Sequence, residues 1–167
     1  MLGEAHFMQI THYLAPDEII APLKGKNKKE IYEELVEHIA KLNGLKDTKK
    51  LLNAIMEREK STSTFLPMSI AIPHARVPDI DDIVFVIGVS KKPIKDEGAG
   101  ALPLSANVFC LFFSPTEEKD FGKHLKLLAR IAGVFSDTNL VTEISKMDSA
   151  DKVFERIQLR EREISEE

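Results

Sequence analysis

The residue of this chain best placed to do chemistry is a histidine that follows a proline. Residues 70–72 form a short apolar segment that runs into Pro73, and His74 stands at the exit of this predicted strand. Proline fixes its own φ and restricts the preceding residue to extended conformations, so the backbone that presents His74 is stiff. A neutral imidazole is a nucleophile that can carry a covalent intermediate. From these residues alone, the alternative is a partly buried structural histidine at a strand edge.

A second histidine, His124, falls in the first turns of a predicted helix. Phe121, Leu125 and Leu128 belong to the apolar stripe of that helix, which we expect to be largely buried. Burial and the positive end of the helix both disfavour the imidazolium form. A neutral ring there can donate one hydrogen bond to an anion without becoming a counter-charge. The alternative is a core histidine bonded to a backbone carbonyl.

Guanidinium and hydroxyl groups precede the first histidine. Arg58 lies in the last turn of a predicted helix, where its charge also complements the helix dipole, and residues 61–64 read Ser-Thr-Ser-Thr. These donors suit a phosphoryl group, because phosphoryl transfer depends on positioning and on donors aimed at its oxygens. The spacing of the histidines is weak evidence for zinc, and neither a hydrolase elbow nor a nucleotide-binding loop is present. We therefore predict neither a metal nor a cofactor.

The ends of several helices can be read from the sequence. Asn27 is a plausible N-cap of a first helix that ends at Gly44, and Asp47 is a plausible N-cap of a second. Asp137 and Asp148 are plausible caps of two further helices near the end of the chain.

Two strands are apolar at nearly every position, over residues 83–89 and 106–113. This pattern is typical of strands that are covered on both faces. Residues 91–103 between them contain several Gly and Pro residues and are predicted to form a connection. Strands interspersed with helices predict an α/β fold with a mixed central β-sheet flanked by helices on both sides.

Composition sets further limits. The 167 residues are 43% hydrophobic and 30% charged, which predicts a single domain over 1–167, with a core from about 8 to 158 and a charged flexible tail at 160–167. A net charge of −4 argues against a nucleic-acid partner. Cys110 is the only cysteine, so an internal disulfide is impossible, and it most resembles a buried small hydrophobe. Without a visible signal peptide or membrane span, the expected location is the cytoplasm.

Several of these segments together resemble the type-2 enzyme IIA domain of the bacterial phosphotransferase system, the class of the fructose, mannitol and nitrogen-regulatory proteins. The resemblance rests on Arg-Glu-Lys at 58–60, Ser-Thr at 63–64, Ile-Ala-Ile-Pro-His-Ala at 70–75 and His-Leu-Lys-Leu-Leu-Ala-Arg at 124–130. It extends in order over most of the chain, from about Met8 to Gln158.

The resemblance implies a role for each candidate residue. His74 would be the phosphorylated nucleophile and His124 the neighbouring stabiliser, while Arg58, Ser63 and Thr64 would bind the phosphoryl group. The phosphoryl group would come from HPr or an HPr-like phosphocarrier protein and pass to a IIB domain of a sugar transporter. The family fold, a mixed sheet flanked by helices, agrees with the fold predicted from the pattern.

One segment departs from the family pattern. The family usually has glycines between the Ser-Thr pair and the proline-histidine segment, whereas residues 65–69 here are Phe-Leu-Pro-Met-Ser. Glycine allows backbone to approach a phosphate closely or to adopt a positive φ, so the pocket wall is expected to differ. Three functions stay open: a free-standing carrier for sugar uptake, a nitrogen-regulatory protein whose phosphorylation state controls binding to other proteins, and a binding module that has lost phosphotransfer.

Overall fold

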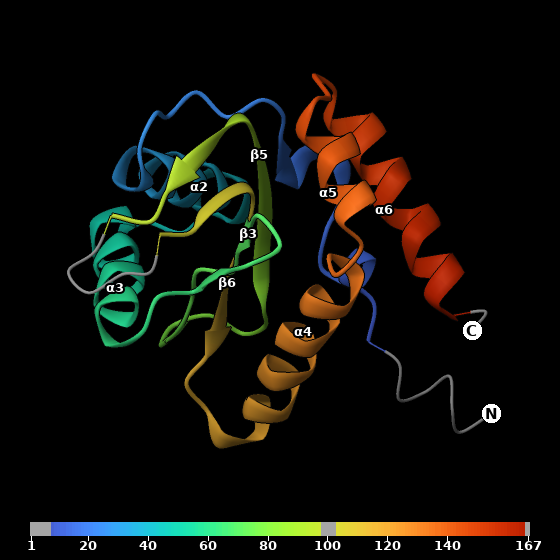
Figure 1. Ribbon diagram of the computed structural model, residues 1–167. Helices are drawn as coiled ribbons and strands as arrows, with labels where there is room; N and C mark the ends of the chain where they lie inside the picture. Colours follow the sequence, from blue (N-terminus) through green and yellow to red (C-terminus); the bar gives the residue numbers. More distant parts are fainter. Residues whose placement is uncertain (1–7, 98–102, 166–167) are drawn as a thin grey trace.

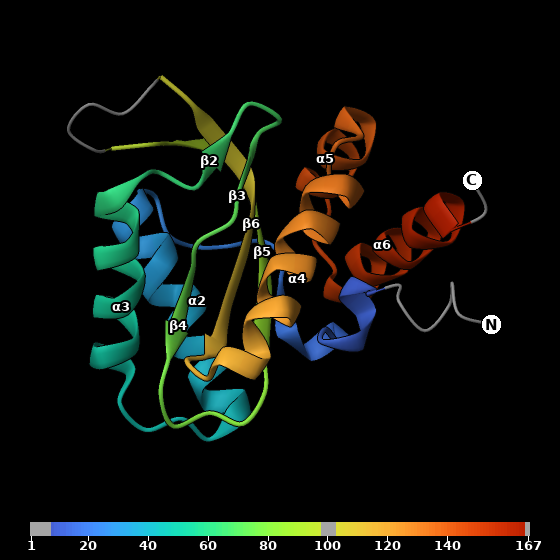
Figure 2. The same ribbon diagram turned by 90° about the horizontal axis from the view of Figure 1, so that it is seen from below.

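A mixed β-sheet lies between two layers of helices in the computed structural model, which describes residues 8–97 and 103–165 (Figures 1 and 2). One layer consists of α2 (Lys28–Asn43) and α3 (Thr48–Ser61), and the other of α4 (Phe121–Val134), α5 (Thr138–Ser145) and α6 (Ala150–Ser165). Short 3-10 helices are η1 (Ile10–His12), η2 (Pro16–Glu18) and η3 (Glu118–Asp120). The predicted α/β architecture is confirmed.

The sheet of the described residues has six strands. They are β1 (Ile19–Ile20), β2 (Phe65–Leu66), β3 (Ile70–Ala71), β4 (His74–Val77), β5 (Val84–Lys95) and β6 (Ser105–Pro115). Their order is β1-β5-β6-β3-β2, and β4 also pairs with β6. The central pair, β5 and β6, is antiparallel, as is the pair β2 and β3, whereas β1 runs parallel to β5 and both β3 and β4 run parallel to β6. Strand β5 extends into the connection predicted for 91–103, as far as Lys95, and residues 98–102 of that connection lie outside the described part.

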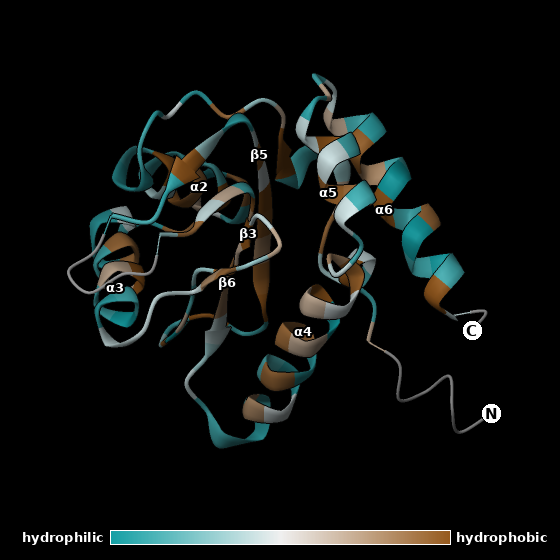
Figure 3. Cartoon of the chain, viewed as in Figure 1, coloured by the Kyte–Doolittle hydropathy of each residue, from teal (hydrophilic) through white to brown (hydrophobic). Residues whose placement is uncertain are grey.

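Apolar residues fill both interfaces between the sheet and the helices. One core cluster packs the sheet against α4, α5 and α6, and the other packs it against α2 and α3. Figure 3 shows the central strands largely in the hydrophobic colour and α6 mostly in the hydrophilic one. Cys110 is fully buried in β6, as expected. Within the described residues, no helix combines the length and apolarity that crossing a bilayer requires.

Strands β3 and β4 are two parts of one path along β6, interrupted at Pro73. Ala71 pairs with Phe109 before the interruption, and His74 pairs with Phe112 after it. Pro73 has no N–H to offer the ladder, but its carbonyl accepts the amide of Phe112 at 3.1 Å, so pairing resumes at once. His74 is therefore the first residue of a strand, and the expectation that it stands at a strand exit is wrong.

Helix ends follow the sequence signals except at α6. At the starts of α2, α3 and α5, the predicted cap side chain accepts a hydrogen bond from a backbone N–H of the first turn. Asp148 does not have this role, because the hydroxyl of Ser149 accepts the Lys152 N–H at 3.3 Å, while Asp148 forms an ion pair with Lys91. The confirmed caps are Asn27, Asp47 and Asp137, and Gly44 ends α2 with φ of 65°.

The charged end of the chain is more ordered than its composition predicts. Residues 160–165, expected to belong to a flexible tail, continue α6. Glu161 is only 2% exposed, accepts the backbone N–H of Ile10 at 2.7 Å and pairs with Arg130 Nε at 3.0 Å. A buried carboxylate needs such partners, and here they attach the last turns of α6 to η1 and α4.

The segment that departs from the family pattern forms β2 and its turn into β3. Phe65 is 4% exposed and packs edge-to-face on Phe109, with ring centroids 5.9 Å apart. Ser69 has φ of 63°, in the left-handed region, and its carbonyl accepts the backbone N–H groups of Asn107 and Val108. Phe65 thus belongs to the core. Ser69 adopts the left-handed backbone conformation, which a glycine would adopt without strain.

Replacing Ser69 with glycine is expected to stabilise the protein by about 0.5–1 kcal/mol, because relief of left-handed strain outweighs the added freedom of the unfolded chain. Ser90→Gly is the control, since Ser90 lies in the extended strand β5 and should lose stability on the same exchange. Urea unfolding of both variants measures the free energies. A loss of stability in Ser69→Gly would contradict the argument.

Candidate functional site

His74 is held by a hydrogen bond within its own strand segment. Its Nδ1 lies 2.7 Å from the carbonyl oxygen of Ile72, and its ring stacks on Phe112, the residue opposite it on β6, with centroids 5.4 Å apart and an interplanar angle of 13°. A carbonyl only accepts, so Nδ1 carries the proton. In the neutral ring the lone pair is therefore on Nε2, the nitrogen that is free to act as a nucleophile.

The surroundings of His74 favour this neutral form. His74 is 7% exposed, and burial lowers the pKa of its imidazole below the usual 6.5. The hydrogen bond to Ile72 opposes this shift, the positive charge of Arg58 adds to it, and Glu59 opposes it weakly. At neutral pH the ring is thus mainly an uncharged nucleophile.

His124 lies beside His74 although fifty positions separate them in the chain. The two ring centroids are 5.2 Å apart at an interplanar angle of 67°, and Phe112 lies 5.1 Å from the His124 ring. His124 is 5% exposed. Burial lowers its pKa to about 4, with further contributions from His74, Arg76 and Arg58. The structure therefore brings the two candidate histidines together, both with a lowered pKa.

A buried serine contacts the second histidine. Ser114, on β6, is fully buried, and its hydroxyl lies within hydrogen-bond distance of His124 Nδ1. Sequence reasoning missed this residue, because its only local sign is one hydroxyl directly after the apolar run 108–113.

Two arginines act on the histidines through their charge. Arg58 donates from Nη1 to the Thr62 carbonyl at 2.9 Å, and its charge lowers the pKa of both rings. Arg76 donates to the carbonyls of residues 115–117 and lies over the Phe121 ring at 4.8 Å. Arg76 thereby fixes the loop between β6 and α4, a function that its position two residues after His74 did not reveal.

The two hydroxyls expected to bind phosphate are bound to carboxylates. Ser63 donates to Asp96 at 2.6 Å, and Thr64 donates to Glu59. The structure thus places both residues in the segment that follows Arg58, but their hydroxyls are occupied. Either hydroxyl has to leave its carboxylate before it can donate to a phosphoryl oxygen.

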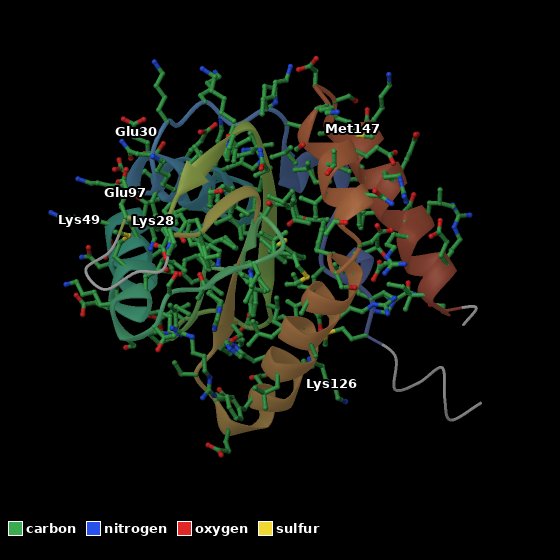
Figure 4. All side chains as sticks on the ribbon, viewed as in Figure 1. Lys28, Glu30, Lys49, Glu97, Lys126 and Met147 are labelled. Atoms are coloured by element: carbon green, nitrogen blue, oxygen red, sulfur yellow. The ribbon has the colours of Figure 1, made fainter. Side chains whose placement is uncertain are left out.

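These carboxylates belong to a buried ionic cluster that we define as Lys28, Glu59 and Asp96. The Lys28 ammonium lies 3.0 Å from Glu59 and 2.8 Å from Asp96, and the three side chains are 9%, 4% and 1% exposed. Burial alone would lower the pKa of Lys28, but its hydrogen bonds to Asp96 and Glu59 raise it. Figure 4 labels Lys28 on the side of the sheet where α2 and α3 lie. The cluster ties both helices to the end of β5.

Apolar side chains remain uncovered next to His124. Phe121 is 40% exposed and Leu125 is 50% exposed, so the expectation that α4 is largely buried is wrong at these two positions. The buried residues of α4 are His124, Leu127, Ile131 and Val134. Phe121 stacks on the His124 ring with centroids 6.0 Å apart, so this open surface borders the site. Over 8–97 and 103–165, no cluster of three or more His, Cys, Asp or Glu could hold a metal ion.

Comparison with known proteins identifies the family. Residues 12–159 match the family described as the phosphoenolpyruvate-dependent sugar phosphotransferase system, EIIA 2. The chain belongs to this family. It is 29% identical over 147 residues to a nitrogen regulatory protein of Bradyrhizobium diazoefficiens, with 88% of this chain and 93% of the relative covered.

Solved structures show the same fold. The nitrogen regulatory protein IIA-Ntr from Neisseria meningitidis superposes with a TM-score of 0.76 at 22% identity, over 89% of this chain and 98% of that one. Enzyme IIA for mannitol from Escherichia coli, solved in complex with phosphorylated enzyme IIB, superposes with a TM-score of 0.69 at 18% identity, over 87% and 96%. The mixed sheet between helical layers is thus the fold of these IIA proteins.

Lys28→Ala is expected to destabilise the protein by roughly 3–5 kcal/mol, because it leaves two buried carboxylates without their cation. The matched control is Lys60→Ala, which removes an exposed ion pair to Glu57 and should cost no more than about 1 kcal/mol. Urea unfolding at neutral pH measures both. Equal costs for the two lysines would refute the structural importance of the cluster.

The pKa of His124 predicts a dependence of stability on pH. The folded pKa of about 4 lies below the usual 6.5, so the unfolded chain binds more protons between these values, and stability falls as pH decreases from 6.5 to 4. In His124→Gln this part of the slope should disappear. Urea unfolding across this pH range tests the expectation, and an unchanged slope in the variant would assign the effect to other groups.

Proposed function

We propose that this protein is a phosphohistidine carrier that accepts a phosphoryl group on His74 from HPr or an HPr-like protein and passes it to a IIB domain. The observation that carries the proposal is the hydrogen bond from His74 Nδ1 to the Ile72 carbonyl, which leaves Nε2 as the nucleophile. Membership of the EIIA family and the neighbouring neutral His124 support it. The expected place of action is the cytoplasm.

In the transfer step, the lone pair of His74 Nε2 forms a bond to phosphorus while the bond from phosphorus to the donor breaks, and the donor group keeps that electron pair. Nδ1 retains its proton and its hydrogen bond to Ile72 throughout. Transfer to the acceptor is the reverse: the acceptor nucleophile bonds to phosphorus and His74 regains its lone pair. Because the ring starts neutral, no proton has to be removed before attack.

The groups around Nε2 would stabilise the charge of the phosphoryl oxygens. His124 would donate one hydrogen bond, and Arg58 would supply positive charge after leaving the Thr62 carbonyl. Ser63 and Thr64 are candidate donors that would first exchange their carboxylate partners for phosphoryl oxygens. In this proposal His124 acts from its present position, whereas Arg58 and the two hydroxyls act after each has left its present partner.

A regulatory function for the same phosphorylation is the second candidate. The relative from Bradyrhizobium diazoefficiens is a nitrogen regulatory protein, and alignment with it covers most of both chains. In that version the phosphorylation state of His74 would control binding to other proteins rather than sugar uptake. Both versions require the phosphoryl group on His74, whereas a binding module without transfer does not.

Incubation with phosphoenolpyruvate, enzyme I and HPr is expected to add one acid-labile phosphoryl group, detected by intact mass. His74→Ala should abolish the addition, whereas His38→Ala should retain it, because His38 lies on α2 and bonds to the Asp17 carbonyl at a distance from the site. No addition with several HPr homologues would favour the binding module. Subsequent loss of the group on mixing with a IIB domain would support transport, and its retention would favour regulation.

A further inference from the structure

We infer that Ser114 is a positioning residue that fixes His124 in the tautomer with the proton on Nε2. The Ser114 hydroxyl contacts His124 Nδ1, and these two residues, ten positions apart, meet because α4 folds back onto the end of β6. Both side chains are buried, with exposed fractions of 0% and 5%. Nothing in the resemblance or the comparisons assigns a role to this serine.

The direction of this hydrogen bond follows from the acceptors that are available to the Ser114 hydroxyl. At neutral pH the His124 ring is uncharged, so only one of its nitrogens carries a proton. If Nδ1 donated to Ser114, the buried serine O–H would need another acceptor. Among the described residues, the one side chain that the hydroxyl contacts is His124. A buried donor without a partner is destabilising, so the hydroxyl donates to Nδ1. The ring proton is then on Nε2.

The position of Ser114 in the sheet explains why its hydroxyl reaches this ring. Ser114 pairs with Arg76 on β4 and lies two residues after Phe112, so its side chain is on the same face of the sheet as Phe112. Phe112 contacts both histidine rings on that face. A serine at this point therefore faces α4, directly after the apolar run 108–113.

The two histidines consequently have complementary roles. His74 has its proton on Nδ1, bound to a carbonyl, and its lone pair on Nε2. His124 has its lone pair on Nδ1, bound to Ser114, and its proton on Nε2. One ring offers a nucleophile and the other a hydrogen-bond donor. In the opposite tautomer, His124 would offer a lone pair to the phosphoryl oxygens and repel them. This consequence rests on the proposed phosphorylation of His74, but the tautomer itself does not.

The test measures the tautomer first. Long-range ¹H–¹⁵N NMR spectra of the unphosphorylated protein at pH 7, with the His124 signals assigned by their loss in His124→Gln, should show the Nε2–H form alone. In Ser114→Ala the Nδ1–H form should become populated. Ser90→Ala is the matched control, because Ser90 is also buried but donates to the Lys92 carbonyl at 2.6 Å, away from His124. The Nδ1–H form in the wild-type protein, or no change in Ser114→Ala, would overturn the inference.

A second measurement connects the tautomer to the phosphoprotein. Loss of one hydrogen bond of about 1 kcal/mol predicts roughly fivefold faster hydrolysis of phosphorylated Ser114→Ala. In the His124→Gln background the same serine exchange should have no effect, since Ser114 acts through His124. An equal effect in both backgrounds would make Ser114 merely structural. If Ser114→Ala does not fold, Ser114→Cys, whose thiol is a weaker hydrogen-bond donor, replaces it in both measurements. The wild-type spectrum still tests the tautomer of His124. If His74 is never phosphorylated, the proposed function fails while the tautomer result stands.

Discussion

The hydrogen bond between His74 Nδ1 and the Ile72 carbonyl is the interaction on which the site depends. It joins two residues on either side of Pro73, whose restricted backbone limits how far donor and acceptor can move apart. On the β6 side, the Phe112 amide binds the Pro73 carbonyl and the Phe112 ring stacks on the imidazole. The ring is thus fixed by backbone on one side and by packing on the other. Every other group matters through its position relative to Nε2.

The charges around this nitrogen disfavour an imidazolium and favour an anion. Arg58 lowers the pKa of both histidines, and Arg76 adds to the effect on His124. The same positive charges would attract the phosphoryl oxygens. Glu59 would oppose them, but it lies 3.0 Å from the Lys28 ammonium, which compensates part of its charge. In the buried ionic cluster, the Glu59 carboxylate therefore lies close to the site with part of its negative charge compensated.

The sequence predicted what depends on local rules and missed what depends on distant contacts. Helix caps, apolar strands and the proline-histidine segment are local signals, and they gave the architecture and the two histidines. Ser114 could not be found, because its importance comes from the fold of α4 onto β6. The occupied hydroxyl of Ser63 is another such case, since its acceptor, Asp96, is thirty-three positions away. The order of residues 160–165 likewise depends on Glu161 meeting the start of the described chain.

In the proposed function, the uncovered apolar surface of α4 would connect the site to a partner. A phosphoryl group on histidine has to be kept from water during transfer, which requires the donor or acceptor to close over it. His74 itself is 7% exposed, whereas Phe121 and Leu125 are 40% and 50% exposed. Phe121 contacts both the His124 ring and the Arg76 guanidinium, so a partner that covers it also excludes water from their surroundings. The helix stripe that sequence periodicity assigned to the core is therefore divided: its inner residues hold His124 against the sheet, and its outer residues border the proposed point of transfer.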